Sequence, residues 1–143
     1  MSVDPQHVGA ATVSTVDPVP IGDGEARLAI ESFAISANNI TYVQTAGDFG
    51  YDRLFANPPG RMIPPVWGHA TVVESRSTLE VGSRWYGLWP AGSHLTVRPG
   101  LTRAGFRDVT ARRTSLNPLY NGYLPGGPDD PRDQIREAAL RPL

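Results

Sequence analysis

The stretch that decides the fold, residues 27–35, reads RLAIESFAI. Within it Leu28 and Ile30 alternate with charged or small residues, which is the two-residue period of a strand with one buried face. Five further stretches are short, rich in β-branched or aromatic residues and bounded by Gly, Pro or Asp. They are residues 11–16, 70–74, 84–88, 94–98 and 106–111. Together these segments predict a mainly β protein, either a small barrel or a sandwich.

Length and composition limit what surrounds these strands. The chain has 143 residues, of which 40% are apolar, enough for one domain but not for two full cores. A formal net charge of −1 gives no overall field that would attract nucleic acid or an anionic membrane surface. No apolar run approaches the roughly 20 residues that span a bilayer, and residues 1–9 lack a signal-peptide pattern. We therefore expect a cytoplasmic protein with no nucleic-acid or membrane partner.

Two residue types are missing, and their absence excludes several kinds of chemistry. Without cysteine there is no disulfide, no thiolate zinc ligand and no cysteine nucleophile. All 13 basic residues are arginine, so Schiff-base catalysis and the lysine of a phosphate-binding P-loop are excluded as well.

Two long connections, residues 36–65 and 117–131, are the places where function is expected, because long loops in compact domains are usually functional. Residues 125–131 are rich in Pro and Gly and read as a linker. A short C-terminal helix over residues 132–141 should follow, with Asp130 as its cap and Pro131 in its first turn. The predicted organisation is a flexible terminus at 1–10, a barrel at 11–124, and a linker with a short helix at 125–143.

Three motifs occur in an order that is similar to the N-terminal GroES-like barrel of the medium-chain dehydrogenase/reductases. They are PVP followed by GE at residues 18–25, GHATVV at residues 68–73, and VGSRWYG at residues 81–87. The stretches 37–42, 65–70 and 120–123 further resemble an uncharacterised subgroup of that superfamily, known only as a domain of unknown function. The resemblance covers residues 11–143 and implies a GroES-like β-barrel.

The departures from the family pattern bear on cofactors. His69 stands where zinc-dependent members have Gly-His-Glu, but Ala70 replaces the Glu and no Cys is present. The resemblance therefore points to the zinc-independent quinone and enoyl reductases, without a metal site. Those enzymes hold NAD(P)H on a Gly-rich turn of a second domain, and no GxGxxG occurs in this chain. We expect no cofactor in this chain, and NADPH only if a nucleotide domain is supplied, whether the chain is a fragment or a barrel living without that domain.

The resemblance also suggests site residues. In zinc-independent reductases the loop that matches residues 37–42 faces the substrate, which implies catalytic roles for Tyr42, Asn38 and Thr41 and a binding role for Asn39. A phenol can donate a proton to a developing enolate, and an amide can orient a carbonyl. The same residue types also suit turns and helix caps, so both readings stay open.

The remaining predicted ligand-binding residues are mostly aromatic and lie on or near the two long connections. They could line a pocket for a hydrophobic small molecule. For His69, a packed and hydrogen-bonded core position is the alternative. These residues are Tyr51, Trp67, His69, Trp89, Tyr120, Asn121 and Tyr123.

Three functions follow as hypotheses. The first is the substrate-binding barrel of a zinc-independent, NAD(P)H-dependent reductase-like protein that is not self-sufficient for redox chemistry. The second is a stand-alone barrel that binds a hydrophobic small molecule, as a non-redox cyclase or isomerase of natural-product biosynthesis that holds a flexible substrate in a reactive conformation. The third is a non-catalytic interaction module that forms a homo-oligomer through an exposed interdomain face.

Overall fold

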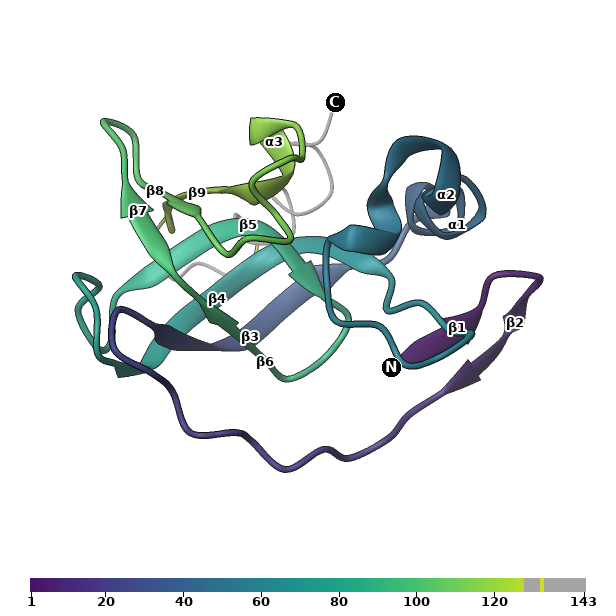
Figure 1. Ribbon diagram of the computed structural model, residues 1–143, viewed down its shortest axis with the longest axis horizontal. Helices are drawn as coiled ribbons and strands as arrows, with labels where there is room; N and C mark the ends of the chain where they lie inside the picture. Colours follow the sequence, from purple (N-terminus) through teal and green to yellow (C-terminus); the bar gives the residue numbers. More distant parts are fainter. Residues whose placement is uncertain (128–131, 133–143) are drawn as a thin grey trace.

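The computed structural model describes residues 1–127 and Arg132 (Figure 1). Seven strands form one antiparallel sheet with the order β6-β3-β4-β5-β9-β8-β7. The central strands of this order are the longest, and β3 pairs with β4 over nearly its whole length. The strands are β3 (Ala26–Ala34), β4 (Pro65–Ser75), β5 (Arg84–Pro90), β6 (His94–Val97), β7 (Pro99–Leu101), β8 (Phe106–Asp108) and β9 (Gly122–Pro125).

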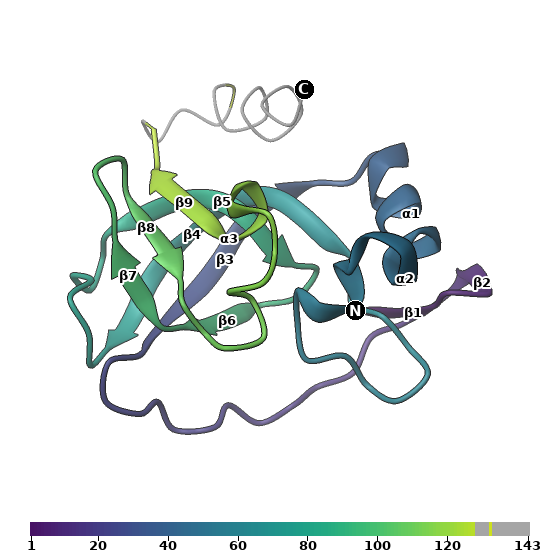
Figure 2. The same ribbon diagram turned by 45° about the horizontal axis from the view of Figure 1, so that its top comes forward.

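The sheet curls into a nearly closed barrel because its two outermost strands are consecutive in the chain. β6 ends at Val97 and β7 begins at Pro99, so Arg98 alone separates them. Figures 1 and 2 show β6 continuing directly into β7, and the change of direction between them is seen in Figure 2. The predicted mainly β fold, a small barrel, is confirmed.

The core fills the barrel with residues that alternate along the strands. In β3, Ala26 and Leu28 are fully buried, and Leu28 lies opposite Val72 of β4. Trp89 and Phe106 complete the centre from β5 and β8. This is the half-buried pattern that the alternation in residues 27–35 predicts.

Five of the six predicted strands correspond to β3, β4, β5, β6 and β8. The sixth, at residues 11–16, is wrong, because the chain there leaves a hairpin of β1 (Ser2–Asp4) and β2 (His7–Thr12) and continues exposed, without regular structure, to residue 20. The pairing of β2 with β1 ends at Thr12, opposite Ser2, so residues 13–16 have no neighbouring strand in the described structure. Strands β7 and β9 escaped the sequence prediction because they are short and contain Gly and Pro.

The first ten residues, expected to be a flexible terminus, instead form most of the hairpin. Val3 exchanges backbone hydrogen bonds with Met62 at 2.8 and 2.9 Å. The guanidinium of Arg61 donates to Ser2 Oγ at 2.9 Å and to the Ala10 carbonyl at 2.9 Å. These contacts fix the hairpin against the connection between β3 and β4.

The first long connection holds helices where a loop was expected. They are α1 (Ala37–Gln44), α2 (Ala46–Phe49) and the 3-10 turn η1 (Tyr51–Arg53). Ser36 begins α1, and its N–H donates to Asn39 Oδ1 at 2.6 Å. Val43 and Ala46 then pack on Val3 of the hairpin. The prolines of this connection come only after η1, so they do not interrupt the helices.

The second long connection also differs from its prediction. It contains α3 (Pro118–Asn121), begun by Asn117, whose side chain accepts from the Leu119 N–H at 3.0 Å. The predicted helix at 132–141 lies outside the described residues except for Arg132. No helix in the described part of the chain is long and apolar enough to cross a membrane.

Candidate functional site

A pocket of about 370 Å³ opens between β5, β9, α3 and the turn that joins β7 to β8. Most of its wall is aromatic or aliphatic, and its polar side chains come from the β7–β8 hairpin, where Thr102 and Arg107 lie. We call this site the α3 pocket. Its apolar lining consists of Trp67, Tyr86, Ala104, Phe106, Pro118, Leu119, Tyr123 and Leu124, with Gly87 and Gly122 between them.

The wall on the barrel side depends on a glycine opposite an aromatic ring. A Cβ at Gly87 would lie 2.3 Å from Cδ1 of Tyr123, so no other residue fits without displacing that ring. The Tyr123 ring in turn stacks on Phe106, with centroids 4.7 Å apart, and packs against Trp89 at 4.5 Å. The pocket wall is therefore continuous with the barrel core.

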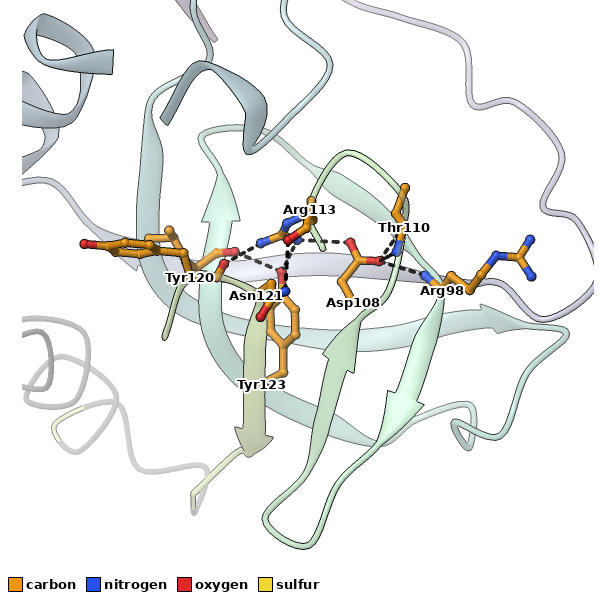
Figure 3. A network of polar contacts seen from close by, with 8 residues as sticks. Arg98, Asp108, Thr110, Arg113, Tyr120, Asn121 and Tyr123 are labelled. Carbon is orange, nitrogen blue, oxygen red and sulfur yellow. Dashed lines mark hydrogen bonds and ion pairs between the residues drawn. The ribbon is translucent and has the colours of Figure 1, made fainter. Parts of the chain in front are cut away.

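The polar end of Tyr123 is held by a buried cation. Arg113 is only 1% exposed, and its Nη1 donates to Tyr123 Oη at 2.6 Å and to Asp108 Oδ2 at 3.1 Å. The Tyr123 hydroxyl donates onward to the Leu88 carbonyl at 3.1 Å. Burial raises the pKa of Tyr123, so the phenol keeps the proton that this bond requires. Figure 3 shows these side chains converging between β8 and β9.

Asp108 connects this cation to the junction of β6 and β7, the two outermost strands, which we call the barrel seam. Its Oδ1 accepts from the backbone N–H of Arg98, at the β6–β7 junction, at 3.2 Å. The same oxygen accepts from the backbone and the hydroxyl of Thr110 at 3.0 and 2.6 Å (Figure 3). Burial lowers the pKa of Arg113, but Tyr123 and Asp108 raise it by more, so the guanidinium stays charged.

The same network positions α3, the outer wall of the pocket. Arg113 Nη2 donates to the Tyr120 carbonyl at 2.5 Å, and Asn121 Nδ2 donates to the Arg113 carbonyl at 3.0 Å (Figure 3). Both bonds cross from the 109–117 loop to α3. The buried ion pair therefore fixes the barrel seam and the pocket wall together.

Three tyrosines, Tyr42 of α1, Tyr51 of η1 and Tyr120 of α3, form a cluster next to the pocket, which we call the tyrosine cluster. The ring of Tyr51 meets Tyr42 edge-on at 4.9 Å and Tyr120 at 5.4 Å. The hydroxyls of Tyr51 and Tyr120 lie 3.2 Å apart. This hydrogen bond, with burial, raises the pKa of Tyr120 to about 12. Trp67 joins the cluster to the pocket, because its Nε1 donates to Tyr42 Oη at 3.4 Å.

The structure separates the predicted site residues into three groups. Trp67 and Tyr123 line the α3 pocket, and Tyr42, Tyr51 and Tyr120 stand together beside it. The residues of the third group do not line the pocket. That group is Asn38, Asn39, Thr41, His69, Trp89 and Asn121.

The third group has structural contacts. Asn39 is buried and donates to the Pro65 carbonyl at 2.6 Å, so it ties α1 to β4. His69 is wholly buried against the Tyr86 ring, 5.2 Å between centroids. Trp89 donates from Nε1 to the Gly68 carbonyl at 2.8 Å. Asn38 and Thr41 are exposed on α1.

Sequence reasoning missed Arg113, Asp108 and the two polar pocket residues, Thr102 and Arg107. Arg113 follows Arg112, and nothing in that pair of arginines shows that one is buried and the other exposed. The only local signal is the spacing from Asp108 to Arg113 across a loop without glycine. The pocket arises from tertiary pairing of β8 with β9, which the sequence does not predict.

Two features of the described residues bear on the zinc and the NAD(P)H of the family that the sequence resembles. The described part of the chain holds no group of three His, Asp or Glu side chains able to bind a metal ion. A described strand leads into a helix at two places, between β3 and α1 and between β8 and α3, and neither connection contains glycine. In that family a glycine-rich turn between a strand and a helix binds the phosphates of the dinucleotide, and the described residues contain no such turn.

Comparison with known proteins identifies a family. The model of a family described as "Protein of unknown function (DUF2855)" matches residues 33–143. The matched region contains the tyrosine cluster, the α3 pocket and the buried Arg113. No curated protein and no solved structure matches the chain.

Proposed function

The chain belongs to the DUF2855 family, and from that premise we propose that its barrel binds an apolar small molecule in the α3 pocket. The observation that carries the proposal is the pocket itself, about 370 Å³ in volume and walled by Trp67, Tyr86 and Tyr123. Sites for small ligands fall in the range of roughly 300–1,000 Å³ and are mostly apolar with a few polar groups. Aromatic walls favour a ligand that carries a ring or a long apolar chain.

The resemblance to zinc-independent reductases supports a substrate-binding role for this barrel. In that reading the ligand is the substrate, and NAD(P)H would be held by a nucleotide domain that the described residues do not provide. No step through the nucleotide follows from the residues present. What this chain contributes is an apolar wall that orients the ligand and excludes water.

A second candidate is a non-redox cyclase or isomerase that holds its ligand beside a phenol. The tyrosine cluster favours it, because Tyr120 follows the pocket residue Leu119 and Tyr42 contacts the pocket residue Trp67. With a pKa of about 12, Tyr120 remains protonated near neutrality and can donate a hydrogen bond. For a cyclase or isomerase, a pocket that holds a flexible apolar substrate in its reactive conformation, beside one proton donor, could be sufficient.

Titration with N-phenyl-1-naphthylamine, an uncharged fluorophore that brightens in apolar sites, tests the proposal. We expect saturable binding with one site per chain. The Leu119→Asp variant should bind at least about tenfold more weakly, because it places a charge on the pocket wall. Leu119 is 61% exposed, so we expect the substitution to leave the fold intact.

The matched control is Val81→Asp, at a residue that is 59% exposed in the connection between β4 and β5 and does not line the pocket. This variant should bind the fluorophore like the wild type. Binding that is lost equally in both variants, or is absent in the wild type, contradicts the proposal. A concentration-dependent mass without fluorophore binding would favour the interaction module instead.

A further inference from the structure

Positive charge is concentrated in the part of the chain that builds the pocket. Residues 98–127 contain five arginines, at positions 98, 103, 107, 112 and 113, and a single acidic residue, Asp108. Asp108 is buried and already paired with Arg113. The exposed surface of this segment is therefore cationic, although the whole chain is nearly neutral.

One of these arginines reaches the pocket. Arg107 is an exposed residue of β8 that lines the α3 pocket, and Thr102, at the β7–β8 turn, lines it as well. The guanidinium of Arg107 has no ion pair or hydrogen bond with another residue in the described part of the chain. By contrast, Arg98 has Glu25 at 3.6 Å, and Arg113 is buried in its network.

Polarity therefore changes across the pocket. Trp67, Tyr86 and Tyr123 make one part apolar, whereas Thr102 and Arg107 place a hydroxyl and an unpaired cation on the hairpin side. An uncharged apolar ligand would form no ion pair with the Arg107 guanidinium. A ligand with an apolar body and an anionic group would match both parts.

We infer that the ligand is an apolar carboxylic acid, held with its carboxylate at Arg107 and Thr102 and its apolar body against Trp67 and Tyr123. This inference rests on the proposed function and specifies the class of ligand. The planar fork of a guanidinium donates two parallel hydrogen bonds to the two carboxylate oxygens, and a hydroxyl can donate a third. One cation in the wall balances one negative charge, which favours a carboxylate over a dianionic phosphate.

Displacement of bound N-phenyl-1-naphthylamine by three competitors of one skeleton tests the inference. The competitors are biphenyl-4-carboxylate, biphenyl-4-methanol and biphenyl-4-yl phosphate. We expect the carboxylate to bind at least about tenfold more tightly than the alcohol, the range of a hydrogen bond to a charged group. The preference should decline as salt rises, because Arg107 is exposed to solvent.

Variants assign the preference to one side chain. Arg107→Gln should remove the preference for the carboxylate over the alcohol, because it removes the cation and keeps a side chain that can donate a hydrogen bond. Arg112→Gln makes the same change of charge at an exposed residue of the same segment that does not line the pocket, and should keep the preference.

The outcomes separate this inference from the proposed function. If the fluorophore binds but the carboxylate is not preferred over the alcohol, the inference is overturned and the proposed function stands. If the phosphate displaces the fluorophore more strongly than the carboxylate, the assignment of a carboxylic acid is overturned. If the fluorophore does not bind, the proposed function itself fails.

Discussion

At the scale of residues, one buried arginine connects the barrel to the pocket. Arg113 neutralises Asp108, orients the Tyr123 hydroxyl and holds the Tyr120 carbonyl, so one cation joins the barrel seam to the wall of the α3 pocket. Its planar group also lies over the Phe55 ring, 5.3 Å from the centroid. A buried cation is tolerated only when it is paired in this way.

Asp108→Asn should destabilise the fold by about 3–5 kcal/mol, because it keeps the shape of the side chain and leaves Arg113 charged and buried without its counter-ion. Urea denaturation measures the free energy of unfolding. Asp52→Asn, at an exposed residue of η1, removes the same charge and should change that free energy little. A loss of less than about 1 kcal/mol for Asp108→Asn would mean that this buried ion pair stabilises the fold no more than an exposed ion pair does.

Tyr51→Phe should lower the pKa of Tyr120 from about 12 toward the ordinary value of 10.0, because it removes the hydrogen bond between the two hydroxyls. The raised pKa means that Tyr120 stabilises the wild-type fold below pH 10 and that this contribution is lost as pH rises to about 12. Near-ultraviolet absorbance of tyrosinate follows the titration, with Tyr120→Phe identifying the signal.

Tyr42→Phe serves as the control for that titration, since the Tyr42 hydroxyl contacts Trp67 rather than Tyr120. It should leave the high-pH step of Tyr120 in place. An unchanged step in Tyr51→Phe would show that burial alone raises the pKa of Tyr120.

At the scale of elements, the local sequence pattern predicts the strands whose side chains fill the barrel. It does not predict the elements that form only because neighbouring segments pair or pack with them. Residues 27–35 have the alternation of a half-buried strand, and β3 forms there. β9 carries Gly and Pro at its two ends and exists because β5 and β8 pair with it on either side. In the same way, the Asn and Thr residues of α1 predict a loop, because these residue types favour turns. The segment is a helix because Ser36 caps its start and Val43 packs on the hairpin.

Gly68→Ala should destabilise the barrel by about 1–3 kcal/mol or prevent folding, because a Cβ there would lie 2.0 Å from the Ser32 carbonyl oxygen of β3. The register between β3 and β4 shifts next to this contact, between Ile30 and Ser32, where the two backbones approach closely. Gly92→Ala is the matched control, since nothing lies within 4 Å of its added carbon.

Thermal and urea denaturation of the two glycine variants decide this point. Equal stability of Gly68→Ala and Gly92→Ala would mean that the two strands can separate without cost, contrary to the packing of the core.

At the scale of the whole molecule, the α3 pocket is assembled from segments that are distant in the sequence. Trp67 comes from β4, Tyr86 from β5, Thr102 and Arg107 from the β7–β8 hairpin, and Leu119 from α3. Sequence alone identified Trp67 and Tyr123 as aromatic residues near long connections, but not the hairpin residues opposite them. Their proximity depends on the pairing of β9 with β5 on one side and β8 on the other, which no local pattern indicates.

The most direct test of the central claim is nuclear magnetic resonance of the chain saturated with N-phenyl-1-naphthylamine. The three tryptophans give three indole N–H signals in different surroundings, and only Trp67 lines the pocket. The account predicts that the Trp67 signal and the amides of residues 102–107 and 119–124 shift, whereas those of Trp85 and the β1–β2 hairpin stay in place. Shifts confined to the hairpin or to the exposed residues 13–20, with Trp67 unchanged, would contradict it.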